Sequence, residues 1–108
     1  MADTLLSPIQ LNPPAGTLTA FYTATAATVF SSLTVCNTGG TSATFSLSVV
    51  VGGSDPDNIK QYIYSGVTIP AKSTFVATIG ITLLANDTIN VLASTPLLGF
   101  NMFGVKIA

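Results

Sequence analysis

The chain has 108 residues, of which 48% are hydrophobic and 6% are charged, and it contains no histidine. This length fits one domain, but soluble proteins usually carry about a quarter charged residues. Three lysines against four aspartates do not form the basic footprint that nucleic-acid binding requires, so no nucleic-acid partner is expected. Because a charge-poor exterior favours association, we expect partner subunits to cover much of this surface.

A membrane-spanning segment is not expected, because the sequence has no run of about 20 consecutive apolar residues. The first residues lack a basic region followed by a continuous apolar segment, so no secretory signal is expected either. The protein is therefore predicted to stay in the cell that makes it. Cys36 has no second cysteine to pair with and no histidine to activate it, which predicts a buried, inert thiol.

Residues 1–17 are predicted to form an extended arm in front of a β-sandwich domain at residues 18–108. Three prolines in this segment remove backbone donors and favour extended geometry in the residues before them. An edge strand of the sandwich itself is the alternative interpretation. The arm is also apolar, and the residues in it that we expect to contact a partner are Leu5, Leu6, Ile9 and Leu11.

The rest of the chain is predicted to form β-strands, because β-branched residues dominate it and groups of Gly, Pro, Asn and Asp interrupt it. Gly80 is predicted to mark a β-bulge or a close approach of two backbones. About eight short strands predict an all-β, antiparallel two-sheet β-sandwich with immunoglobulin-like or jelly-roll connections, and a closed barrel is the alternative. The expected strands are 18–23, 28–36, 43–49, 59–64, 67–69, 74–84, 88–93 and 98–107.

Alternation of apolar and polar residues predicts which strand faces are buried. In the strand at 43–49 the apolar residues share one face, whereas Ser46 and Ser48 belong to a polar face that we expect to be exposed. The last strand differs, because Phe100 lies on one face and Phe103 on the other. Both faces of that strand therefore carry large apolar groups.

The sequence lacks the residues that common catalytic sites require. Without histidine or glutamate, and with one cysteine, it has no Ser-His-Asp arrangement and no zinc ligand set, so neither enzyme activity nor a cofactor is expected. Asp55, Asp57 and Asn58 could offer oxygen ligands to Ca²⁺, but the same residues are typical of a solvated turn, which we prefer. For the same reason Asn86 and Asp87 are predicted to form a turn in which Asp87 bonds the backbone.

Three tyrosines are candidates for binding. Tyr62 and Tyr64 alternate on one predicted strand face, where with Tyr22 they could form a platform for stacking against a carbohydrate. Interface or core packing is the preferred interpretation, because tyrosines are common in both settings. Tyr62 and Tyr64 are therefore included among the expected partner-binding residues.

Seven short segments of the chain occur in a characteristic order and spacing. They include Ser31-Ser-Leu-Thr-Val-Cys-Asn37 and Phe100-Asn-Met-Phe-Gly-Val105, with further segments at 18–22, 62–64, 74–75, 78–81 and 93–94. Together they resemble a group of small virion structural proteins of tailed bacteriophages. The resemblance covers nearly all of the body of the chain and implies a β-sandwich component of a phage particle, without any catalytic set that could be transferred.

On this basis we expect a capsid decoration (cement) protein that binds the capsid exterior and stabilises contacts between capsomers. Its expected partners are the major capsid protein and further copies of itself, in a homo-oligomer such as a trimer. It would be made in the host cytoplasm and reside on the capsid surface of the virion. The alternatives are a structural component of the neck, tail or baseplate, and a surface carbohydrate-binding module.

Overall fold

The computed structural model describes residues 4–107, which form nine β-strands and one short 3₁₀ helix. The helix is η1 (Ile59–Gln61). The strands are β1 (Thr4–Leu5), β2 (Ile9–Leu11), β3 (Thr19–Thr23), β4 (Thr28–Asn37), β5 (Ala43–Val50), β6 (Tyr62–Ile69), β7 (Thr74–Leu83), β8 (Thr88–Ala93) and β9 (Leu98–Lys106).

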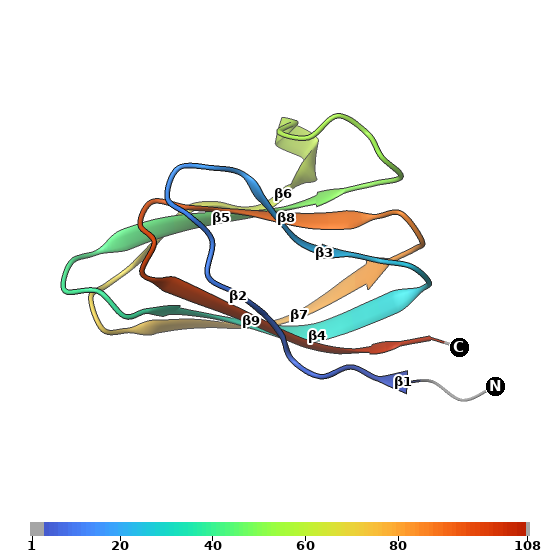
Figure 1. Cartoon of the computed structure of the whole chain (residues 1–108), viewed down its shortest axis with the longest axis horizontal. Coiled ribbons are helices and arrows are strands. Elements are labelled where there is room, and N and C mark those ends of the chain that lie inside the picture. The colour runs from blue at the N-terminus through green and yellow to red at the C-terminus, as the bar shows by residue number, and fades with distance from the viewer. Residues whose placement is uncertain (1–3, 108) are drawn as a thin grey trace.

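Two antiparallel sheets face each other, which confirms the predicted two-sheet sandwich (Figure 1). In the five-stranded sheet, β1 and β2 both pair with β9, which is followed by β4 and then β7. The four-stranded sheet has the order β3, β8, β5, β6. Because each sheet has one face toward the other, strands such as β8 and β9 bury alternate residues.

The connections are those of a jelly roll. The described strands pair in nested order, β5 with β6, β4 with β7, β3 with β8 and β2 with β9. Between β2 and β9, each connection crosses from one sheet to the other, apart from the hairpin that joins β5 to β6. This order matches one of the two predicted connection patterns and differs from the immunoglobulin arrangement.

The core between the sheets is built around aromatic side chains. Phe45 on β5 and Phe100 on β9 are fully buried, with ring centroids 5.8 Å apart in an edge-to-face arrangement. Phe21 on β3 contacts Phe100 in the same way at 5.9 Å. Burying a side chain of this size stabilises the fold by about 1.5–3 kcal/mol, so this cluster contributes to holding the two sheets together.

The segment predicted as an arm runs along the edge of the five-stranded sheet, as the alternative interpretation had it. Ile9 pairs with Met102 and Leu11 with Phe100, which places β2 beside β9. Asn12 fixes the end of this segment, because its side-chain Nδ2 donates a hydrogen bond to the carbonyl of Leu98 at 2.8 Å. Residues 4–12 are therefore part of the sandwich.

The predicted strands at 59–64 and 67–69 are wrong in their boundaries. Residues 59–61 form η1, since the side chain of Gln61 accepts a hydrogen bond from the backbone of Asn58 and holds the chain in a turn. The strand β6 then continues through Gly66, whose φ of +62° allows an irregularity that most other residues would resist. The break in alternation at this glycine is the reason two strands were expected.

Ser46 and Ser48 are buried, contrary to the prediction that they face solvent. The segment between β5 and β6 folds over the outer side of the four-stranded sheet, as Figure 1 shows, and η1 contacts β5. The hydroxyl of Ser46 accepts a hydrogen bond from the backbone N–H of Gly66 at 2.9 Å. The prediction failed because alternation describes one strand and carries no information about a loop that folds back over it.

A close approach of two backbones occurs at Gly104. A Cβ atom built there would lie 2.8 Å from the Cα of Phe30 and closer still to the carbonyl oxygen of Val29. Gly80, where such an approach was predicted, has open space around it. Gly80 does lie in the irregular stretch where β4 and β7 change register, so the predicted bulge is present there.

Substituting Gly104→Ala is expected to destabilise the fold by about 1–3 kcal/mol, because the methyl group overlaps the backbone of β4. Urea denaturation of the purified protein would measure this loss. Gly80→Ala is the matched control and should change the free energy of unfolding little, since nothing lies within 4 Å of its Cβ position. Equal stability of the two variants would contradict the packing described at Gly104.

Candidate interaction surface

Among residues 4–107, the outer face of the five-stranded sheet carries no charged side chain. Its residues follow from alternation and from the registers of β4 with β7 and β9. We call this set the uncharged face, and none of its members is buried. It comprises Leu5, Gln10, Val29, Ser32, Thr34, Cys36, Thr74, Val76, Thr78, Gly80, Thr82, Gly99, Asn101, Phe103 and Val105.

The uncharged face exposes large apolar groups beside hydroxyl groups. Leu5 is 83% exposed, Val76 is 65% exposed and Phe103 is 37% exposed. Thr34 lies in the centre of the face, across from Asn101 on one side and Val76 on the other. Depletion of charge and exposure of aromatic and aliphatic groups are typical of the central part of protein interfaces.

The charged residues lie elsewhere among the described residues. Asp55, Asp57 and Lys60 belong to the segment between β5 and β6, and Lys72 precedes β7. Lys106 ends β9 across from the buried Thr28, which places it on the inner side of the sheet. Binding at the uncharged face therefore desolvates no charge of its own, and removing charges from water is the costliest part of burying a surface.

Cys36 belongs to the uncharged face and is only partly buried, so the predicted buried thiol is wrong. Val35 and Asn37 on either side of it face inward and are buried. The Asn37 side chain is held there because its Nδ2 donates to the carbonyl of Thr41 at 2.9 Å, and its Oδ1 accepts from the N–H of Gly39. Because successive side chains of a strand point to opposite faces, the inward positions of Val35 and Asn37 place the side chain of Cys36 on the outer face.

The four apolar residues expected to contact a partner lie in different settings. Leu5 lies on the uncharged face and is exposed. Leu6, Ile9 and Leu11 pack against the hydrophobic core of their own chain. The structure therefore leaves Leu5 as the member of this group that is free to meet a partner.

The side chains of the two candidate tyrosines on β6 contact other residues of their own chain. Tyr64 packs its ring between Phe45 and Phe75, with centroid distances of 5.8 and 5.2 Å. The hydroxyl of Tyr62 donates a hydrogen bond to the carboxylate of Asp57. Tyr22, on β3, contacts Phe30 edge to face at 5.2 Å. These contacts are internal, and the three rings do not present one common stacking surface.

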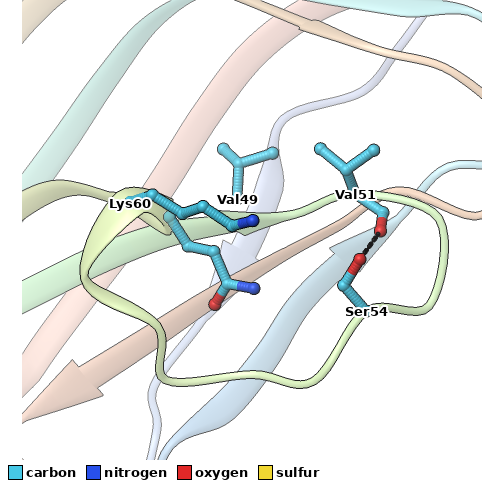
Figure 2. A pocket seen from close by; sticks show the side chains of 5 residues that line it. Val49, Val51, Ser54 and Lys60 are labelled. Atoms are coloured by element: carbon cyan, nitrogen blue, oxygen red, sulfur yellow. Dashed lines mark hydrogen bonds between the residues drawn. The ribbon is translucent and has the colours of Figure 1, made fainter.

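The segment between β5 and β6 encloses a shallow hollow of about 330 Å³. Figure 2 shows Lys60 extending toward Val49 on one side, and a hydrogen bond from the hydroxyl of Ser54 to the carbonyl of Val51 on the other. The floor includes Gln61, which is buried and donates to the carbonyl of Asp55. The polar groups of this segment thus mainly bond one another.

Asp87 fixes the turn between β7 and β8, as predicted. Its Oδ2 accepts a hydrogen bond from the N–H of Leu84 at 2.9 Å. Its Oδ1 accepts from the N–H of Gly52 at 2.8 Å, so the same carboxylate also anchors the start of the segment that covers the four-stranded sheet. This second role joins residues far apart in sequence and had no local signal.

The described residues contain no group of three or more His, Cys, Asp or Glu side chains placed to hold a metal ion. Residues 4–107 also include no helix with the length and apolar character to cross a membrane. Searches of protein-family models, of curated proteins and of solved structures found no match for this chain. The uncharged face is the feature of the described surface that most clearly fits a binding role.

Most of the uncharged face was not singled out from the sequence. The signal was present at Phe103, since the last strand carries large apolar groups on both faces. Val29 and Val76 had no comparable signal, because they join the same face through the strand order β9, β4, β7. That order connects residues more than forty positions apart, and local patterns do not report it.

Because of the hydrogen bond between Tyr62 and Asp57, the stability of the fold depends on pH in the alkaline range. The hydrogen bond to Asp57, partial burial and the negative charge of Asp57 together raise the pKa of Tyr62 above its ordinary value of 10.0. A raised pKa in the folded state stabilises the fold fully below the unfolded pKa, and this stabilisation is lost as the pH rises through the folded value.

Tyr62→Phe is therefore expected to be less stable than the wild type at neutral pH, and the difference should shrink above about pH 10. Urea unfolding at a series of pH values would measure it. Tyr64→Phe is the control, because no hydrogen bond from its hydroxyl is found among the described residues. A difference for Tyr62→Phe that stays constant through this range would contradict the role given to the bond.

Proposed function

We propose that the protein is a non-enzymatic structural protein of a bacteriophage virion, specifically a capsid decoration (cement) protein. The uncharged face adheres to the capsid exterior, where its partner is the major capsid protein. Bound across neighbouring capsomers, the rigid sandwich stabilises the contacts between them. The mechanism is adhesion through buried surface and requires no chemistry.

The observation that carries this proposal is the exposed sheet face without charge. Burying apolar surface contributes about 25 cal/mol per Å², and the gain is not offset here by the desolvation of ionic groups. Hydroxyl groups such as that of Thr34 can donate and accept hydrogen bonds with a partner backbone or with bridging water. A permanently covered face also gives a reason for the low charged share of the whole chain.

Two further features support a virion role. Jelly rolls occur in viral capsid domains and in lectins, although a fold by itself does not determine function. The segments that resemble phage virion proteins fall largely in the five-stranded sheet, with 31–37 in β4, 74–75 and 78–81 in β7, and 100–105 in β9. The resemblance is thus concentrated in the sheet that presents the uncharged face.

The alternatives differ in how they relate to this geometry. A neck, tail or baseplate component could use the same face, so the structure favours neither location over the capsid. A carbohydrate-binding module would need an exposed aromatic platform, and Tyr64 is packed against Phe45 and Phe75. No geometric feature of residues 4–107 favours glycan binding over protein binding.

The copy number of the protein in purified virions tests the proposal. Quantitative mass spectrometry against the major capsid protein is expected to give a ratio near one or a simple fraction of one, because cement repeats with the capsid lattice. A few copies per particle would instead place the protein in the neck or tail. Absence from the virion would overturn the virion role altogether.

A charge placed on the uncharged face is expected to block attachment. Thr34→Lys puts an ammonium group in the centre of the face, where burial would leave it without a partner. Loading onto particles that lack the protein, measured by co-sedimentation, should fall at least tenfold. Thr68→Lys is the control, since Thr68 is exposed on the other sheet. Equal loading of both variants would contradict the assignment of the face.

A further inference from the structure

The four sheet edges of the sandwich are protected to different degrees. Unpaired strand edges expose backbone donors and acceptors that attract other strands, and proteins usually blunt them with short strands, prolines, bulges or charges. The β1 and β2 edge is broken into two pieces of two and three residues, with Pro8 between them. The β3 edge has five residues and a register shift, and the β6 edge is irregular around Gly66.

The edge formed by β7 has less of this protection, and its one irregularity is the register shift with β4 between Thr78 and Ile81. The strand is ten residues long, Thr74–Leu83, with no proline and no charged residue. Exposed residues alternate with less exposed ones along its whole length, so the register shift with β4 does not change which residues of β7 face outward. Among the described strands, only β4 pairs with it, so every second residue directs its N–H and C=O away from the sheet.

We propose that β7 pairs with β7 of a second copy of the chain, antiparallel across a two-fold axis at Thr78, to form a dimer with one continuous ten-stranded sheet. This inference concerns the isolated protein and does not rest on the proposed virion role. Antiparallel strands of the same sequence satisfy each other's unpaired backbone groups, and a two-fold axis closes the assembly at two subunits.

The register follows from the two faces of the strand. Residues directly opposite each other must point to the same side of the sheet, so their numbers must have an even sum. An axis at Thr78 places Thr74 opposite Thr82 of the second copy, and Thr78 opposite its own counterpart. Cross-strand threonine pairs stabilise β-sheets. The two adjacent registers, centred on Ala77 and on Ile79, form no threonine pair on this face.

The inner side of β7 also gains from this pairing. Phe75 and Ile79 pack against the core but remain partly exposed at the edge. In the dimer Phe75 lies across from Ile81 of the second copy, and Ile79 lies across from its Ala77. The apolar surface that the edge leaves open is thereby covered.

Charge does not oppose the pairing. The charged residue nearest to β7 on its N-terminal side is Lys72, six residues before the axis. With a rise of about 3.3 Å per residue, the two Lys72 backbones would lie roughly 40 Å apart, far beyond the screening length of about 8 Å at physiological salt. The pairing would also join the two uncharged faces into a single larger surface.

Sedimentation velocity of the full-length protein and two lysine variants tests the dimer. The wild type is expected to sediment as a dimer in the micromolar range, whereas Thr78→Lys, which places two ammonium groups about 5 Å apart across the axis, should halve the mass. Ser32→Lys is the matched control. It lies on the same face directly opposite Thr78 but one strand farther from the axis, so its charges would be about 14 Å apart and the dimer should persist.

Several results would overturn the proposal. These are a wild type that is monomeric throughout this range, a trimer or larger closed assembly, and a dimer that survives Thr78→Lys with an unchanged circular dichroism spectrum. If Thr78→Lys does not fold, a second measurement decides. Spin labels at Thr78→Cys in a Cys36→Ser background should give a shorter distance between subunits than labels at Ser32→Cys, by about two strand spacings or 10 Å. The reverse order of distances would reject pairing at β7.

Discussion

The packing of Phe45 against Phe100 fixes the orientation of everything else in this molecule. Phe45 belongs to the four-stranded sheet and Phe100 to the five-stranded sheet, and both are fully buried. Because side chains alternate along a strand, placing Phe100 inside places Asn101 and Phe103 outside on the same strand. The pairing of β4 with β9 and β7 then carries this choice across the whole sheet. The uncharged face is therefore a direct consequence of how the core is packed.

The two outer faces of the sandwich differ in how far the chain itself covers them. The four-stranded sheet is partly covered by the chain's own segment between β5 and β6, which buries Ser46 and Ser48 and is anchored by the bond from Gly52 to Asp87. The five-stranded sheet has no such cover within the described residues and exposes Phe103, Val76 and Leu5. An internal cover on one side and an open, charge-free surface on the other agree with a protein that is attached through one face.

The sequence predicted the strands that bury one clear apolar row and failed where distant segments meet. In β5 the alternation placed Phe45 inside correctly, but it could not show that a later segment covers the serines. Residues 1–17 left two interpretations open, because an apolar, proline-containing segment suits either a partner or its own sheet edge, and only the pairing of β2 with β9 decides between them. Of the expected partner-binding residues, Leu5 is exposed, whereas Leu6, Ile9, Leu11 and Tyr64 pack inward.

The central claim is that the uncharged face is covered in the assembled particle. Oxidative labelling of side chains, read by mass spectrometry, measures this directly on the free protein and on purified virions. Phe103 and Cys36 are expected to be labelled in the free protein and protected in the virion, while Tyr62 on the other sheet is labelled in both. Equal labelling of Phe103 and Cys36 in the two states would contradict the claim.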